Sequence, residues 1–208
     1  MLDFLANLDD YFCENYANYD RICVLPGYKM PVMQTTMMDE FGRTRAYTLP
    51  PSTMRLALQE NKAELLKELK ARLTDATFSF SFQPVGFFQR IKDKFSQLSF
   101  AGNLKKMLQR YGVSMEEAGA ELNIDEEIWT KICKGALLPT KNLIFSLALT
   151  SQISLTDTQT LLLLCDEEFD YSIVKDTVIS YLLHSKVYNR GMIDTALKEY
   201  KVGNLFIK

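Results

Sequence analysis

Apolar residues recur at helical spacing along much of the chain, beginning at the N-terminus. In residues 2–19, leucine and aromatic side chains fall three or four positions apart, at Leu2, Leu5, Leu8, Phe12, Tyr16 and Tyr19. One apolar residue per turn predicts an amphipathic helix. Between residues 21 and 51 the pattern changes, and proline or glycine interrupts it four times, at Pro26-Gly27, Met30-Pro31, Phe41-Gly42 and Pro50-Pro51. Helices do not continue through such positions, so this part predicts loops with short strands, one at 22–25.

The next three segments complete a small α+β region. Residues 53–73 carry leucines on one helical face and Glu and Lys on the other, and Ser52 is a suitable N-cap. Residues 77–82 alternate phenylalanine with Ser or Thr, which predicts a strand that pairs with 43–49 or 22–25. A further apolar stripe predicts a helix over 84–98.

From residue 103 onward the pattern is helical throughout. We expect at least five consecutive helices and no strand, so that strands are confined to residues 20–83. The chain is thus predicted to be mainly α, with a small α+β domain at 1–98 and an all-helical domain at 103–208, divided at residues 96–103 around Gly102. The predicted helices are 103–111, 114–121, 125–134, 140–151, 155–165, 172–186 and 189–200.

Local signals mark the ends of these helices. Ser114-x-x-Glu117 is a capping box, and Asp125 can cap the helix that follows. Gly135 stands where a helix ends and positive φ is favoured. Pro139-Thr140 is expected to end one element and begin the next.

These residues carry a family resemblance. The string from Tyr111 to Ile124, followed by Ile132-x-x-Gly135, Pro139-Thr140, Leu147-Ala148 and Ser154-Leu155, resembles the XRE family of phage-repressor-like helix-turn-helix domains. The resemblance implies a tri-helical core formed by Leu122, Ile124, Ile132, Leu147 and Ala148. It also implies a recognition helix whose candidate contact residues are Asp125, Glu126, Glu127, Trp129, Thr130, Lys131 and Lys134.

The similarity extends beyond the usual end of that family. Over residues 111–206 the chain is similar to a divergent helix-turn-helix tail found in several bacterial stress-associated proteins, which suggests a shared scaffold and a bacterial or phage origin. Members of the XRE family commonly dimerise. The apolar segment 202–207 either makes such a homodimer contact or folds back onto its own domain. No family is recognised for residues 1–95.

Charge changes what the recognition helix is expected to do. The net charge is −2, so the chain has no general attraction for nucleic acid. Residues 113–136 hold six acids against Lys131 and Lys134, and three of the acids, at 125–127, begin the predicted helix. Such carboxylates repel phosphates, but they also interact favourably with a helix dipole or accept hydrogen bonds from cytosine. Trp129 is expected to be either a core anchor or an exposed contact for a protein.

Two groups of basic residues are candidates for anion or phosphate contacts. Arg43 and Arg45 alternate on a predicted strand, where they either clamp an anion or keep a strand edge soluble. The second group either supplies phosphate contacts beside the recognition helix or forms a solvated helix face. Its members are Arg90, Lys92, Lys94, Lys105, Lys106 and Arg110.

Little in the sequence favours an enzyme, a cofactor or a metal site. His184 lies near Ser180 and Ser185 without the glycines of an oxyanion hole, and no nucleotide-binding or zinc-protease motif is present. The four cysteines are scattered, which favours reduced, mostly buried thiols over a zinc site. The N-terminus lacks the pattern of a signal peptide, and the longest apolar run is too short to cross a membrane.

The sequence therefore predicts a non-enzymatic cytoplasmic regulatory or adaptor protein that uses a helix-turn-helix scaffold mainly for protein-protein contact. The alternative is a sequence-specific DNA-binding transcriptional regulator of the XRE type. We expect no cofactor, no metal and no membrane partner.

Overall fold

The computed structural model describes residues 2–30, 34–48, 55–75, 79–86, 99–203 and 205. These residues are mainly helical, with two short antiparallel strand pairs. In chain order the elements are α1 (Leu2–Asn15), α2 (Tyr19–Ile22), β1 (Gln34–Met38), β2 (Thr44–Thr48), the 3₁₀ turn η2 (Leu56–Leu58), α3 (Lys62–Arg72), β3 (Phe82–Pro84), α5 (Phe100–Arg110), α6 (Met115–Glu121), α7 (Glu126–Cys133), β4 (Leu137–Pro139), α8 (Lys141–Thr150), α9 (Leu155–Leu163), α10 (Val174–His184) and α11 (Arg190–Glu199).

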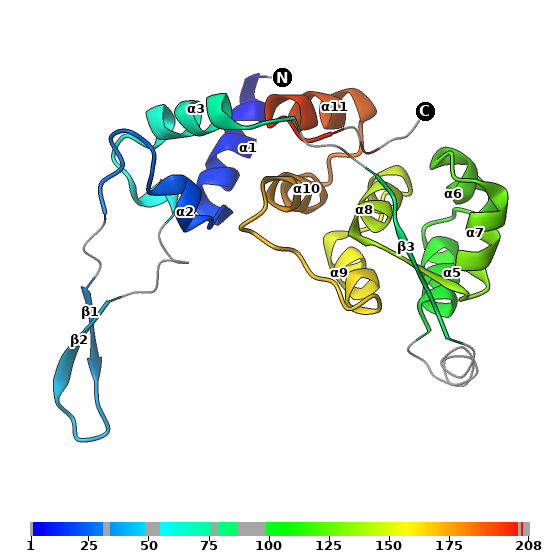
Figure 1. Ribbon diagram of the computed structural model, residues 1–208, viewed down its shortest axis with the longest axis horizontal. Helices are drawn as coiled ribbons and strands as arrows, with labels where there is room; N and C mark the ends of the chain where they lie inside the picture. The colour runs from blue at the N-terminus through cyan, green and yellow to red at the C-terminus, as the bar shows by residue number, and fades with distance from the viewer. Residues whose placement is uncertain are drawn as a thin grey trace.

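Two groups of helices lie at opposite ends of the molecule, and a central group of helices joins them (Figure 1). Helices α5, α6 and α7 lie together at one end, and α1, α2 and α3 lie at the other. Helices α8, α9 and α10 occupy the middle, and α11 runs beside α1 and α3. The β1–β2 hairpin, in which Thr36 pairs with Ala46, projects away from the helices.

The seven helices predicted after residue 100 are all present, and their observed bounds differ from the predicted ones by three residues or fewer. The local signals act as expected. The Ser114 hydroxyl accepts the backbone N–H of Glu117 at 3.1 Å, while the Glu117 carboxylate accepts that of Ser114 at 2.8 Å. Gly135 ends α7 at a φ of +66°, and Thr140 is the N-cap residue of α8. The ends of these helices are therefore encoded by neighbouring residues.

The prediction of an all-helical chain after residue 103 is wrong at one place. Strand β4 pairs antiparallel with β3, with Leu138 opposite Gln83, so strands are not confined to residues 20–83. The physical reason is Pro139, which disfavours helical backbone at the residue before it and cannot continue a helix itself. The strand predicted at 77–82 is corrected too, since only Phe82 belongs to a strand among its described residues, and its partner is β4.

Several N-terminal elements also differ from their predicted bounds. Residues 22–25 form the end of α2 and a turn, so the strand expected there is wrong. The helix expected over 53–73 begins only at Lys62, after Asn61, and Ser52 lies outside the described residues. The first helix ends at Asn15 and a second one begins at Tyr19. Most of the predicted 84–98 helix lies outside the described residues.

The proposed boundary at 96–103 is occupied in part by helix. Phe100 already begins α5, and the hydroxyl of Ser99 caps it by accepting the backbone N–H of Gly102. Residues 96–98 lie outside the described residues. A glycine in the first turn of a helix does not interrupt it, because the hydrogen-bond ladder is still incomplete there.

The N-terminal helices and the C-terminal helices share one hydrophobic core. Tyr11 of α1 hydrogen-bonds Ser180 of α10 through their hydroxyls at 2.8 Å. The Lys70 ammonium of α3 bridges Asp9 of α1 at 2.7 Å and Glu199 of α11 at 2.8 Å. Helices α1 and α3 are thereby held to α10 and α11, and the division into domains 1–98 and 103–208 stays a prediction.

Four of the five residues expected to form a tri-helical core are buried. Leu122, Ile132, Leu147 and Ala148 are each at most 1% exposed. Ile124 is only partly buried, so the expectation of near-complete burial is wrong there. It lies in the turn between α6 and α7, where it faces a groove described below.

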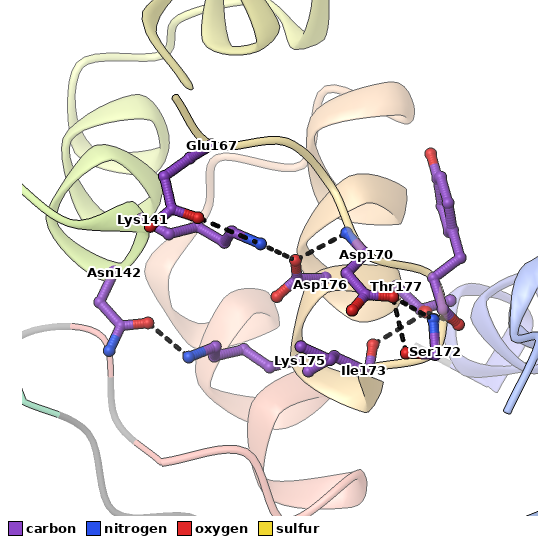
Figure 2. Close-up of polar contacts among 10 residues, drawn as sticks. Lys141, Asn142, Glu167, Asp170, Ser172, Ile173, Lys175, Asp176 and Thr177 are labelled. Carbon is purple, nitrogen blue, oxygen red and sulfur yellow. Dashed lines mark hydrogen bonds and ion pairs between the residues drawn. The ribbon is translucent and has the colours of Figure 1, made fainter. Parts of the chain in front are cut away.

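A buried ionic cluster fixes the central helices to one another (Figure 2). Asp176 of α10 is fully buried, and its Oδ2 accepts the Lys141 ammonium of α8 at 2.9 Å and the backbone N–H of Asp170 at 2.9 Å. Glu167 lies 3.7 Å from the same ammonium. The cluster therefore joins α8, the α9–α10 connection and α10.

Candidate functional site

The candidate site is the surface formed by α6 and α7, two helices that a four-residue turn connects. The start of α7 on this surface is acidic. Glu126 and Glu127 form the exposed first turn of α7. Asp125 is the N-cap residue, and its Oδ1 accepts the backbone N–H groups of Glu127 at 2.9 Å and Ile128 at 3.2 Å. One oxygen of the Asp125 carboxylate thus caps the helix that it begins.

Two of the predicted contact residues of α7 pair with each other. The Lys131 ammonium lies 2.6 Å from the Glu127 carboxylate, one helical turn away. This pair leaves Glu126 as an exposed acid for which the described residues supply no ion pair. Lys134 is exposed at the C-cap, and Thr130 is half-buried. Six of the seven predicted residues therefore reach the surface, at least in part.

The seventh, Trp129, is a core residue. It is 8% exposed, and its indole Nε1 donates to the Met115 carbonyl at 2.7 Å. A Cβ built at Gly119 would lie 2.6 Å from Trp129 Cδ1 and Nε1, closer than real Cβ atoms come to their neighbours. The indole thus packs directly on the backbone of α6. This geometry supports the core-anchor interpretation of Trp129, which also lines the groove described next.

A groove of about 840 Å³ lies between α5, α6 and α7. Its apolar lining includes Val113, Met115 and Ile124. Four charged side chains also line it, two basic and two acidic: Lys105, Lys134, Glu116 and Glu126.

Sequence reasoning missed the acidic groove residue of α6. Glu116, Ala120 and Asn123 follow one another at spacings of four and three residues, and all line the groove. That spacing was available as a signal, because residues so separated share one helical face. Asn123 also has a φ of +49°, in the left-handed region that ends α6 and turns the chain toward α7.

Cys133 lines the same groove as a protonated thiol. Burial raises its pKa above the usual value, and the negative charge of Glu116 raises it further. A thiol whose pKa is raised is a poor nucleophile at neutral pH. All four cysteines are free thiols, Cys13 buried and the other three half-buried, and none of them is exposed.

The basic residues of α5 are only partly brought to the site. Lys105 lines the groove and Lys106 is exposed. Arg110 is turned toward α9, where it lies 3.0 Å from Asp157. The other three members of the predicted basic group, at positions 90, 92 and 94, lie outside the described residues.

The two arginines of the hairpin stand apart from this site. Arg43 and Arg45 are exposed, and the Arg45 guanidinium lies 3.1 Å from the Asp39 carboxylate. The hairpin and α7 are at opposite ends of the molecule (Figure 1). The fold therefore does not combine the two predicted anion-binding groups into one surface.

The residues considered for catalysis have other contacts. The Ser180 hydroxyl lies between the hydroxyls of Tyr11, at 2.8 Å, and Tyr171, at 3.0 Å. His184 is exposed at the end of α10, with its ring 5.7 Å from that of Tyr11. Within the described ranges, His, Cys, Asp and Glu side chains do not gather in groups of three suited to a metal ion. None of the helices in those ranges combines the length and apolarity of a membrane span.

Comparison with protein-family models, with curated proteins and with solved structures found no match for this chain.

Proposed function

We propose that the protein is a non-enzymatic regulatory or adaptor protein that binds a protein partner through the α6–α7 surface. The observation that carries this proposal is the acidic first turn of α7, where Glu126 and Glu127 are exposed. In a repressor-type domain this turn enters the major groove of DNA. Duplex DNA carries about one negative charge per 1.7 Å of its axis, so the turn is repelled where it would have to bind.

The contacts of Asp125 restrict base reading by this acid to its second carboxylate oxygen. A carboxylate that reads cytosine must accept a hydrogen bond from the N4 amino group. Here the Asp125 Oδ1 already accepts two backbone N–H groups of α7. Turning this oxygen toward a base would uncap the helix, which costs about 0.5–2 kcal/mol.

The groove supplies a surface suited to a protein side chain. It has the size of a ligand pocket, and it combines apolar walls with Glu116 and Glu126 at its edges. An apolar residue of a partner would be buried between α6 and α7, while the rim would bind polar groups around it. The predicted cytoplasmic location belongs to this proposal.

DNA binding is the alternative, and the lysines around the groove favour it. Lys105, Lys106 and Lys134 are exposed, and the described residues provide no carboxylate within ion-pair distance of them. They flank the acidic turn and could contact phosphates on either side of it. Homodimerisation through the C-terminal tail has less support, because Val202 and Leu205 are buried within the chain.

A titration against duplex DNA tests the proposal. Fluorescence anisotropy at low salt is expected to show only weak, sequence-independent binding by the wild type. The variant Glu126→Gln/Glu127→Gln should bind more tightly, because two charges that repel phosphates are removed while Asp125 still caps α7. A matched control is Glu60→Gln/Glu64→Gln, which removes the same charge from two exposed residues around the start of α3.

The opposite result would establish the alternative. Submicromolar binding by the wild type with a steep salt dependence would identify a DNA-binding regulator. Loss of sequence preference in the Glu126→Gln/Glu127→Gln variant, without a gain in affinity, would show that the carboxylates read bases.

A further inference from the structure

A second cavity, away from the α6–α7 surface, is lined by basic side chains from three parts of the chain. It has a volume of about 320 Å³ and lies where α2, the end of α3, the start of α10 and the segment after α11 meet. Its basic residues are Arg21, Lys175 and Lys201, and none of the described residues that line it is acidic. Arg21 and Lys201 bring two positive charges to this cavity although the whole chain has a net charge of −2.

The cations differ in how they are held. The Lys201 ammonium donates to the Leu73 carbonyl at 2.7 Å, which fixes it at the end of α3 with further N–H donor capacity. Arg21 is exposed on α2, beside the buried hydroxyl of Tyr16. That hydroxyl has no hydrogen-bond partner among the described residues. Burial raises the pKa of Tyr16 to about 12, so the hydroxyl keeps its proton.

Lys175 lines the cavity at the start of α10. Its side chain extends toward Asn142, whose Oδ1 accepts the ammonium (Figure 2). The cavity is lined by Ile173, which precedes α10, and by Val174 and Lys175, the first residues of α10. Ile173 is the N-cap residue and has no side-chain acceptor for the N–H groups of this turn.

The two carboxylates close in sequence to the start of α10 are directed to other partners. Asp170 accepts the backbone N–H of Ser172 at 2.8 Å and the Ser172 hydroxyl at 2.7 Å, and these bonds lower its pKa. Asp176 faces Lys141 on the other side of the turn. Neither acid lines the cavity. We propose that this cavity binds a small phosphate-bearing anion, held by the Arg21 guanidinium, the Lys201 ammonium and the backbone N–H groups at the start of α10.

Calorimetric titration of the full chain with inorganic phosphate in a low-chloride buffer tests the proposal. We expect saturable binding with one site per chain. Arg21→Gln should weaken it about tenfold, because a charge-assisted hydrogen bond is lost from an exposed side chain without disturbing the core. Lys198→Gln is the matched control, since it removes an exposed lysine of α11 that does not line the cavity and should leave the affinity unchanged.

A second variant separates loss of binding from loss of folding. Ile173 has the extended backbone of an N-cap residue, with φ −103° and ψ 125°. Ile173→Asp should cap α10 and raise the melting temperature while abolishing phosphate binding, because its carboxylate occupies the same N–H groups and repels the anion. A parallel titration with O-phosphoserine identifies the source: tighter binding than inorganic phosphate assigns the site to a phosphomonoester, and equal binding assigns it to free phosphate.

Three results would overturn the proposal. They are the absence of saturable binding at millimolar phosphate, equal weakening by Arg21→Gln and Lys198→Gln, and unchanged affinity in Ile173→Asp. The second result would mean that phosphate associates with the general surface. None of these outcomes bears on the α6–α7 surface, which the DNA titration addresses separately.

Discussion

The contact between Trp129 and Gly119 sets how closely α6 and α7 approach. A tryptophan at this position requires space that only a residue without a Cβ provides, since any Cβ would lie 2.6–3.0 Å from three atoms of the indole. The indole also satisfies its N–H by donating to Met115. The two residues therefore act as one unit, and the shape of the neighbouring groove depends on both.

Gly119→Ala should destabilise the protein by about 1–3 kcal/mol, because the added methyl group forces the indole or α6 to move. The control is Gly102→Ala in α5, where a Cβ meets only Ser99 at an ordinary 3.7 Å. This change should stabilise by about 0.5–1 kcal/mol through helix propensity. Urea unfolding followed by Trp129 fluorescence measures both. Equal effects would show that the indole does not pack against α6.

Buried hydroxyls and thiols make the protein sensitive to alkaline pH. Burial raises the pKa of Tyr11 and Tyr16 from 10.0 to about 12, and that of Cys13 from 9.0 to about 11. Above the unfolded pKa values, the unfolded chain releases protons that the folded chain retains. The free energy of unfolding therefore has its full value below about pH 9 and decreases as the pH rises toward 12. Each group lowers it by about 1.4 kcal/mol per pH unit between the pKa of that group in the unfolded chain and its pKa in the folded chain.

The variant Tyr16→Phe isolates the contribution of Tyr16 to this decrease of the free energy of unfolding with pH. The Tyr16 hydroxyl has no hydrogen-bond partner among the described residues, so its removal should leave the stability at neutral pH unchanged or slightly higher. The decline of the urea midpoint between pH 10 and 12 should be less steep in the variant than in the wild type. An identical slope would indicate that Tyr16 ionises as readily in the folded chain as in the unfolded one.

At the scale of elements, the cluster around Asp176 joins three segments through one buried carboxylate. Lys141→Met should cost about 3–5 kcal/mol, because it leaves Asp176 charged and buried without its ammonium. Lys131→Met removes an exposed pair with Glu127 and should cost about 0.5 kcal/mol or less. The double variant Lys141→Met/Asp176→Leu should recover much of the loss. Urea unfolding compares the three, and a similar cost for both single changes would contradict the structural importance of the cluster.

The elements that were predicted well are those encoded locally. Ser114, Asp125 and Gly135 fix the ends of α6 and α7 through bonds to residues two to four positions away, so their sequence spacing was sufficient. Strand β4 was missed because its hydrogen bonds go to β3, which lies more than fifty residues earlier. The groove was missed for a similar reason, since it depends on how three helices pack. The sequence named Lys105 as a candidate phosphate contact and Glu126 as a candidate residue of the recognition helix, but it could not show that they line one space.

At the scale of the whole molecule, the first helix is part of the C-terminal core. Phe12 of α1 stacks on Tyr16 and contacts Tyr200 after α11, with both ring pairs 4.6 Å apart. The Tyr200 hydroxyl donates to Asp9 at 2.7 Å. Side chains near the two ends of the chain are thus buried together. This arrangement favours unfolding as one unit over independent unfolding of residues 1–98 and 103–208.

Equilibrium unfolding with two local probes distinguishes these possibilities. Trp129 is the only tryptophan and reports on α7, while Cys13 is buried in α1 and reports on the N-terminal helix. The experiment uses a variant that keeps only Cys13. In this variant the loss of native tryptophan fluorescence and the labelling of the exposed thiol should follow the same urea dependence. The reason is that α1 cannot separate from α10 without exposing Tyr11, Ser180 and their apolar neighbours. Lys70→Ala, which removes the bridge between Asp9 and Glu199, should lower both midpoints together. Separate midpoints in the single-cysteine protein, with the thiol exposed first, would instead support two domains that fold independently.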